Sequence, residues 1–279
     1  MRHYSYKPQS DWGTSVTTTF DPNVPHVARV LDYLQGGTAN FESDRQVAEY
    51  AFAAWPGGDV RVDVRAARAA LVRIVKFLTA EAGIRQFLDI GTGIPTADNV
   101  HEVAQALAPE THVLYVDNDP MVLTHARALM KSSPEGRTAF VQADIRRPAD
   151  ILQHPVLVSV LDSSRPVALL LIGIVHHLRD ADAPVDVVRT LVEWLPSGSY
   201  LALVTPSADF DPQMMRSLAV TAERSGIPYI PRSKSETERF FTGLELVAPG
   251  VAPILGWRPD DEPADVNAVH GWAGLARKA

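Results

Sequence analysis

Three aspartates stand where a chain of alternating strands and helices would present side chains to a ligand. Asp89 comes just before a glycine turn, Gly91-Thr92-Gly93, at the end of an apolar segment. Asp117 ends the next apolar segment, and Asp144 follows the one after that. A glycine turn between a strand and a helix lets the backbone approach a ligand closely and directs the helix amides toward it. The pattern therefore predicts a ligand site built at successive strand ends.

The glycine turn does not complete the fingerprint of a dinucleotide-binding protein. That fingerprint is Gly-x-Gly-x-x-Gly, whereas the sixth position here is Thr96, preceded by Pro95. The carboxylate of Asp89 would repel a pyrophosphate but suits a cationic amino-acid ligand. The charges therefore favour S-adenosylmethionine over NAD, and the candidate contacts at this turn are Asp89, Gly91, Thr92, Gly93 and Pro95.

The other two aspartates suit the nucleoside part of such a ligand. Asp117 lies 24 residues after Gly93, near the spacing of about 20 at which an acid accepts hydrogen bonds from a ribose. Asn118 adjoins it, and Asp144 can accept from an adenine amino group while Ile145 packs on the ring. Each feature alone has a plainer explanation as a tight turn, a helix cap or a loop acid. Their occurrence at three consecutive strand ends favours a shared ligand.

Two adjacent histidines follow the fourth apolar segment. His176 and His177 come three and four residues after Gly173. Histidine can take a proton from a hydroxyl or an amine near neutral pH. We expect Gly173 and His176 to form part of the cofactor site, with His177 as the weaker candidate for a base. The alternative is that either histidine only packs under the next helix, and positioning alone can drive a methyl transfer. Adjacent residues rarely converge on one ion, so no metal site is expected.

A loop near the N-terminus is a candidate lid. Gly36-Gly37 ends a helical segment, and Asn40 and Arg45 follow. One interpretation is a helix stop followed by a solvated first turn. The other is that Tyr33, Asn40 and Arg45 face the methionine carboxylate or the acceptor, since arginine binds a carboxylate through its forked donors. The second interpretation predicts that Arg45→Ala weakens cofactor binding.

Strands and helices alternate from residue 84 onward, which predicts a parallel, doubly wound sheet. Strands are expected at residues 86–90, 112–116, 138–142, 167–172 and 200–204. Helices are expected between them at residues 96–107, 119–130 and 184–195, and another at 211–223. A capping box is expected at residues 235–238, and residues 244–247 and 271–276 predict an antiparallel hairpin.

Before residue 84 the pattern is helical only. Helices are expected at residues 26–35 and 42–55, after a polar arm at residues 1–25. A third helix is expected to carry an apolar face from Val64 to Leu78 and to end at Gly83. The predicted fold class is therefore α/β, a Rossmann-like three-layer α/β/α sandwich with an N-terminal helical cap. Residues 1–80 would form the arm and cap, and residues 81–279 the core that binds the cofactor.

Composition limits the classes of function. The 279 residues carry a net charge of −7, contain no cysteine and are 46% hydrophobic, which is ordinary for a globular protein. The absence of cysteine excludes disulfides and thiolate chemistry, and is compatible with a reducing cytoplasm. The acidic balance and the lack of a basic module argue against a nucleic-acid substrate. The longest apolar run, residues 167–175, is shorter than the roughly 20 residues that cross a bilayer, so no membrane partner is expected.

The order of Asp89-x-Gly91-x-Gly93, Asp117 and Asp144-Ile145 resembles the class I S-adenosylmethionine methyltransferases. Over residues 20–279 the chain resembles, more narrowly, an S-adenosyl methyltransferase family formerly known as a domain of unknown function. The matching segments are residues 25–29, 32–37, 40–41, 44–45, 87–96, 115–119, 244–247 and 249–250. The resemblance implies a seven-stranded sheet with the cofactor across the strand tips and no particular substrate. Ile94-Pro95 departs from the broad class, in which a third glycine is common.

The leading hypothesis is an enzyme that transfers a methyl group from S-adenosylmethionine to a small molecule, at oxygen or nitrogen. One alternative is a non-catalytic S-adenosylmethionine sensor or partner subunit. A second is an NAD-dependent oxidoreductase, which Asp89 and the missing third glycine disfavour. A cytoplasmic location is expected, and the sequence does not indicate an oligomeric state.

Overall fold

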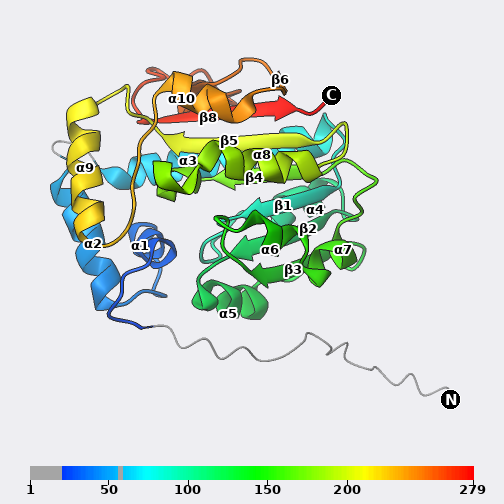
Figure 1. The fold of residues 1–279 in the computed structure, drawn as a ribbon, viewed down its shortest axis with the longest axis horizontal. Coiled ribbons are helices and arrows are strands. Elements are labelled where there is room, and N and C mark those ends of the chain that lie inside the picture. The colour runs from blue at the N-terminus through cyan, green and yellow to red at the C-terminus, as the bar shows by residue number, and fades with distance from the viewer. Residues whose placement is uncertain (1–20, 56–58) are drawn as a thin grey trace.

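The computed structural model describes residues 21–55 and 59–279 (Figure 1). Most of the arm expected at residues 1–25 lies outside the described residues. The described part forms one sheet in the order β3-β2-β1-β4-β5-β8-β6, with β7 paired to β8. The strands are β1 (Gln86–Ile90), β2 (His112–Asp117), β3 (Arg137–Gln142), β4 (Ala168–Ile172), β5 (Tyr200–Pro206), β6 (Glu245–Leu246), β7 (Ala252–Pro253) and β8 (Gly271–Arg277).

The sheet is parallel from β3 to β5 and antiparallel at its C-terminal edge. β1 pairs with β2 and β4, β2 with β3, and β4 with β5, all in parallel. β8 runs antiparallel to β5, β6 and β7. The mixed sheet and the hairpin of β6 with β8 confirm the predicted fold class. The eighth strand, β7, was not predicted, because two residues that include Pro253 give no strand signal.

Helices cover both faces of the sheet, because side chains alternate between its faces and the parallel strands are apolar on both. α3 (Val60–Ala80), α4 (Val100–Leu107) and α5 (Pro120–Leu129) pack against side chains such as Phe87, Val113 and Leu170. α6 (Pro148–Leu152), α7 (Pro155–Val160) and α8 (Pro184–Trp194) pack on the opposite face, with Leu88 and Leu169. α6 and α7 are too short to give a helical period in the sequence, and neither was predicted.

Three further helices form a cap at one end of the sheet. α1 (Val27–Leu34), α2 (Glu42–Ala53) and α9 (Pro212–Arg224) share a separate apolar cluster. Figure 1 shows them grouped at the end toward which the parallel strands point. The N-terminal helices therefore close over the carboxyl ends of the strands, together with one helix from the second half of the chain.

Two predicted helix starts were wrong. α4 begins at Val100 rather than Thr96, because a capping box joins Asn99 to Glu102. The capping box expected at residues 235–238 lies two residues earlier, where Ser233 and Glu236 cap α10 (Lys234–Glu238). No helix in the described residues is long and apolar enough to cross a membrane.

Candidate functional site

Two hollows lie at the carboxyl ends of the parallel strands. The smaller, of about 60 Å³, is bordered by the ends of β1, β2 and β3, and its lining includes Asp117, Asn118, Asp144 and Ile145. The larger, of about 260 Å³, extends from β1 and β4 toward the cap. Both are lined by Val27, Ala28, Leu31, Gly91, Gly93 and Gly173. The two hollows therefore meet at the glycine turn, beneath α1.

At two glycines, Gly93 and Gly173, the backbone itself forms the wall where the two hollows meet. Gly93 has φ +68° and Gly173 has φ +69°, and a Cβ added to either would find no atom within 4 Å. Positive φ strains any residue that has a side chain, and the open space in front of both glycines is free for a ligand. Gly91 differs, because a Cβ there would lie 2.7 Å from the Ile174 side chain. Gly91 is thus required by packing, and the other two keep the hollow open.

Asp117 organises the glycine turn. Its Oδ2 accepts a hydrogen bond from the Gly93 amide at 2.9 Å, and its Oδ1 accepts one from the Asp119 amide at 2.9 Å. The side chain is buried, and burial raises the pKa of its carboxyl. A carboxylate has about four acceptor positions, so Asp117 can hold the turn and still accept from a ligand.

Asp89 is buried, and its carboxylate has one hydrogen-bond partner among the described residues. It accepts a hydrogen bond from the Thr92 hydroxyl at 3.1 Å, and burial raises its pKa to about 6. Arg68 of α3 opposes this shift through its positive charge. A cationic group placed beside Asp89 would stabilise its charged form.

Arg68 lines the larger cavity, and no pattern in the sequence distinguishes it as a site residue. Its guanidinium donates to the carbonyl oxygens of Ala97 and Asp98, at 2.9 Å each. In the sequence it is one of several arginines on the polar side of a helix, 21 residues before Asp89. Only the packing of α3 against α4 and the sheet brings it to the site.

Asp144 and Ile145 border the smaller hollow on the β3 side. Burial pulls the pKa of the Asp144 carboxyl upward, but hydrogen bonds from the Arg146 guanidinium and amide outweigh it, so the pKa lies below its usual value. Asp144 is therefore ionised at neutral pH. Ile145 is buried and gives this end of the hollow an apolar wall.

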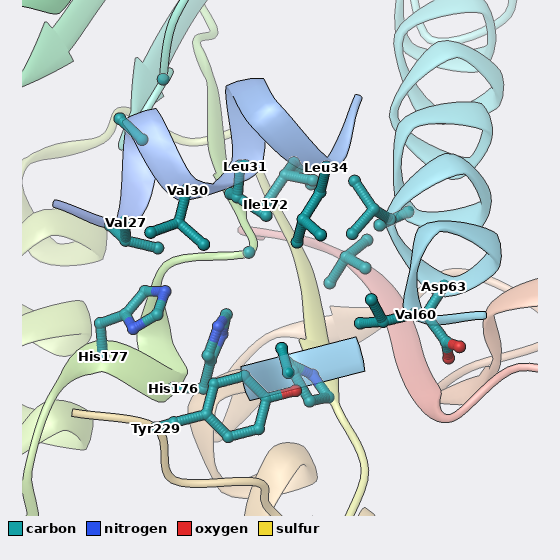
Figure 2. Close-up of a pocket in the computed structure, with 18 of the residues that line it drawn as sticks. Val27, Val30, Leu31, Leu34, Val60, Asp63, Ile172, His176, His177 and Tyr229 are labelled. Atoms are coloured by element: carbon teal, nitrogen blue, oxygen red, sulfur yellow. The ribbon is translucent and has the colours of Figure 1, made fainter. Parts of the chain in front are cut away.

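His176 and His177 lie in a short 3₁₀ turn after β4 and line the larger cavity. Figure 2 shows both rings beneath α1, with Tyr229 beside His176. The Nδ1 of His177 lies 2.6 Å from the carbonyl oxygen of Pro228. A carbonyl only accepts, so the ring proton sits on Nδ1 and Nε2 carries the lone pair.

Both histidines are neutral at physiological pH. Burial lowers the pKa of His177 to about 4 and that of His176 well below its usual value. The two ring centroids are 3.9 Å apart, and His176 meets the Tyr229 ring edge-on at 5.0 Å. Neither the Nε2 of His177 nor the Nδ1 of His176, both buried, has a hydrogen-bond partner among the described residues. The pair therefore offers two unprotonated ring nitrogens without hydrogen-bond partners among the described residues.

α1 covers both hollows and is held there by polar contacts of His26 and Arg29. The Nδ1 of His26 lies 3.1 Å from the Asp119 carboxylate, and its Nε2 lies 3.1 Å from the Asn118 side-chain oxygen. Arg29 of α1 forms buried ion pairs with Asp119, at 3.2 Å, and with Asp44 of α2, at 3.6 Å. These contacts join the cap to the loop after β2.

Four of the predicted contacts line neither hollow: Tyr33, Asn40, Arg45 and Pro95. Asn40 donates to the Asp32 carboxylate, and Arg45 donates to the Asn40 side chain and to Glu42. Tyr33 donates to Glu49 on the outer side of the cap. The donors of Asn40 and Arg45 are used within the turn between α1 and α2, so these side chains shape the cap rather than face the cavity.

The larger cavity continues into the cap as an apolar chamber. Its cap-side lining is Val30, Leu31, Leu34, Val47, Ala51, Trp55, Val60, Val64, Leu71, Met215, Leu218 and Ile227. Asp63 also lines it and accepts a hydrogen bond from the backbone amide of His270. No group of three or more metal-ligating side chains within residues 21–55 and 59–279 is arranged to hold a metal ion.

Comparison with known proteins gives three main results. A family model described as S-adenosyl methyltransferase matches residues 13–279. The structure of a DUF574 family protein from Streptomyces avermitilis is 45% identical and has a TM-score of 0.89, over 93% of this chain and 99% of that chain. A structure from Thermobifida fusca is 41% identical and has a TM-score of 0.83, over 92% of this chain and 96% of that chain.

A more distant structure shares the fold alone. It is a methyltransferase dependent on S-adenosylmethionine from Anabaena variabilis, 13% identical, with a TM-score of 0.51 over 76% of this chain and 84% of that chain. No curated protein matches the chain.

Proposed function

The chain belongs to the S-adenosyl methyltransferase family, and we propose that it methylates a small molecule at oxygen or nitrogen. The cofactor of the family is S-adenosylmethionine, whose sulfonium supplies an electrophilic methyl group. The observation that carries the proposal is the pair of hollows that meet at Gly93 and Gly173. The lining of the smaller hollow suits a nucleoside, and the larger hollow extends into the chamber that would take the acceptor.

The lining of the hollows fits the parts of this cofactor. We assign the ribose to Asp117, which has acceptor capacity left, and the adenine to Asp144, Ile145 and Asn118. The cationic methionine end would lie at Asp89 and Thr92, where a buried carboxylate lacks a counter-charge in direct contact. Arg68 has the charge to pair with the methionine carboxylate. No direct contact is assigned to Tyr33, Asn40, Arg45 or Pro95.

The protein's own groups would orient the reactants and exclude water. α1 covers the junction of the hollows, and Gly173 leaves room for two reacting groups to approach each other. His176 and His177 are neutral and can accept a proton at this junction. Holding two reactants in attack geometry lowers a barrier substantially without further chemistry.

The chamber argues against a sensor that only binds the cofactor, because such a protein needs no second space beside the methyl group. An NAD-dependent oxidoreductase is disfavoured by Asp89, whose carboxylate would oppose a pyrophosphate. The cysteine-free sequence suits a reducing compartment, so a cytoplasmic location is part of the proposal.

The test is calorimetry with S-adenosylhomocysteine on Gly93→Ala and on Gly83→Ala. Both glycines have φ near +70° and no atom within 4 Å of an added Cβ, so both variants carry similar backbone strain, of about 1 kcal/mol. Only the methyl of Gly93→Ala projects into the hollow. We expect Gly93→Ala to bind S-adenosylhomocysteine at least tenfold more weakly than the wild type. Gly83→Ala should bind it with the affinity of the wild type.

A wild-type chain that fails to bind S-adenosylhomocysteine would refute the proposed function. Equal affinity in the two variants would refute the placement of the cofactor at the glycine turn.

A further inference from the structure

The cap-side chamber of the larger cavity is apolar on almost every side. Its walls come from α1, α2, α3 and α9, and Arg68 is the only lysine or arginine among its described lining residues. The Arg68 guanidinium is held at the glycine-turn end by the carbonyl oxygens of Ala97 and Asp98. Asp63 is engaged by His270, and burial raises the pKa of its carboxyl. Hence the chamber offers no cation that would hold an acidic group on the acceptor.

One unprotonated ring nitrogen on the lining of the larger cavity has a fixed orientation. The bond from Nδ1–H of His177 to the Pro228 carbonyl leaves Nε2 as the acceptor. That nitrogen is buried and has no hydrogen-bond partner among the described residues. A buried acceptor without a partner costs free energy. A hydrogen bond donated by a hydroxyl of the ligand would recover that free energy. In Figure 2 the His177 ring lies beneath Val27, on the cavity side of the turn.

We propose that the acceptor is a largely apolar, uncharged molecule with an aromatic or enolic hydroxyl, and that Nε2 of His177 takes the proton of that hydroxyl. This inference rests on the methyl transfer proposed above and names its substrate class and its base. The O–H bond of the acceptor breaks, and its proton moves to Nε2. The oxygen forms a bond to the methyl carbon as the carbon–sulfur bond breaks, and the bonding pair stays on sulfur. The imidazolium then releases the proton to solvent.

Other acceptor groups fit this chamber less well. A carboxylate would enter an apolar space without a partner cation, and a protonated amine would enter beside two neutral imidazoles, at a high desolvation cost in each case. An aliphatic hydroxyl is too weakly acidic to pass its proton to an imidazole efficiently, because proton transfer works best between groups of similar pKa. An aromatic or enolic hydroxyl is closer in acidity and arrives uncharged.

The neighbouring rings are placed to orient a flat acceptor. His176 packs against His177 and meets Tyr229 edge-on. Trp55 lies at the other end of the chamber, edge-on to His270 at 5.1 Å. Aromatic edges and faces favour planar rings, so His176 acts here as a positioning residue.

The binding test uses 2-naphthol as the probe and 2-naphthoate as its matched carboxylate. Calorimetry is carried out on the full chain saturated with S-adenosylhomocysteine. We expect 2-naphthol to bind and 2-naphthoate to bind at least tenfold more weakly. No binding of 2-naphthol, or tighter binding of 2-naphthoate, would overturn the acceptor class alone. If S-adenosylhomocysteine itself does not bind, the proposed function falls and this inference falls with it.

The role of His177 is tested with His177→Gln, whose amide can still donate to the Pro228 carbonyl but has no basic nitrogen. His112→Gln is the matched control, because the Nδ1 of His112 also lies 2.9 Å from a carbonyl oxygen, that of Val160, away from the chamber. We expect His177→Gln to bind 2-naphthol within about threefold of wild type but to methylate it about 100-fold more slowly or worse. Its residual rate should rise with pH as the naphthol ionises, whereas the control and the wild type stay flat from about pH 6 to about pH 8.

Equal rates in the three proteins, or binding of 2-naphthol to the wild type without methylation, would overturn the inference. Nitrogen NMR on the wild type labelled with ¹⁵N-histidine is independent of how the variant folds. At pH 7 the Nε2 of His177 should give the signal of an unprotonated nitrogen, and that signal should shift when 2-naphthol binds. A protonated Nε2 in the ligand-free protein would contradict the assignment.

Discussion

At the scale of a single residue, the buried carboxylate of Asp89 lowers the stability of the folded protein at neutral pH. Burial raises the pKa of its carboxyl to about 6, so at neutral pH the folded protein holds an ionised group where an uncharged one would be more stable. A bound cation would remove that cost. The ligand-free protein is therefore less stable than its core would allow, which is the cost expected of an acid that meets the amino group of the cofactor in the proposed binding mode.

We predict that Asp89→Asn stabilises the ligand-free protein, and more so at higher pH. The folded pKa lies above the unfolded one, so the native state binds more protons between about pH 4 and about pH 6, and wild-type stability falls as pH rises through that range. Asparagine does not titrate. The gain in unfolding free energy, measured with urea, should be on the order of 2 kcal/mol larger at about pH 7 than at about pH 4.5.

The same variant should bind S-adenosylhomocysteine more weakly at pH 7, because a neutral amide cannot pair with the amino group. If the difference in unfolding free energy between Asp89→Asn and the wild type does not change with pH, the ionised carboxylate of Asp89 does not destabilise the folded protein.

Spacing in the sequence could identify the residues of the strand tips but not those brought from elsewhere. Asp89, Asp117 and Asp144 lie at or just beyond the ends of three successive strands. Parallel strands end at one edge of a sheet, so the proximity of the three acids follows from the pattern. Arg68 and Tyr229 come from segments with no such relation to the strands. The tautomer of His177 depends on the carbonyl of Pro228, 51 residues later, which no local pattern reveals.

At the scale of elements, α1 is the part on which the site most depends. Its inner side lines both hollows, and Arg29 ties it to Asp44 on α2 and to Asp119 after β2. These three side chains are buried. Buried ion pairs add little net stability, but removing one partner leaves uncompensated charge.

We predict that Arg29→Met lowers the free energy of unfolding by about 3 kcal/mol. The side chain keeps most of its volume, so the loss reflects the two carboxylates left without their cation. Arg189→Met is the matched control, because Arg189 pairs with Asp186 and Glu193 on the exposed side of α8 and surface pairs contribute little. A small, equal effect of both variants in urea unfolding would contradict the anchoring role of Arg29.

Helix starts were harder to predict than the helices themselves, because several positions satisfied the same local rule. Ser233 and Ser235 both precede an acid by three residues, and the structure uses Ser233, where the Lys234 amide also donates to Asp209. Thr96 was expected to start α4, but Asp98 has φ +59° and Arg68 holds the carbonyl oxygens of residues 97 and 98. In both cases a contact distant in sequence decides the boundary.

At the scale of the whole molecule, the sheet and the cap contribute different parts of the candidate site. The sheet supplies the glycine turn and the acids at the ends of β1, β2 and β3. The cap, made of α1, α2 and α9, supplies the apolar chamber beside them. The alternation of strands and helices predicted the first part. The helical segments before residue 84 predicted a cap, but not the chamber inside it, because α9 joins α1 and α2 from 159 residues beyond the end of α2.

A crystal structure of the protein with S-adenosylhomocysteine tests the central claim most directly. We predict density along the junction of the two hollows, with the ribose hydroxyls at Asp117, the adenine between Asp144 and Ile145, and the amino group at Asp89. The sulfur should face the chamber that holds His177. A ligand bound outside these hollows, or reversed so that its adenine lies in the chamber, would contradict the account.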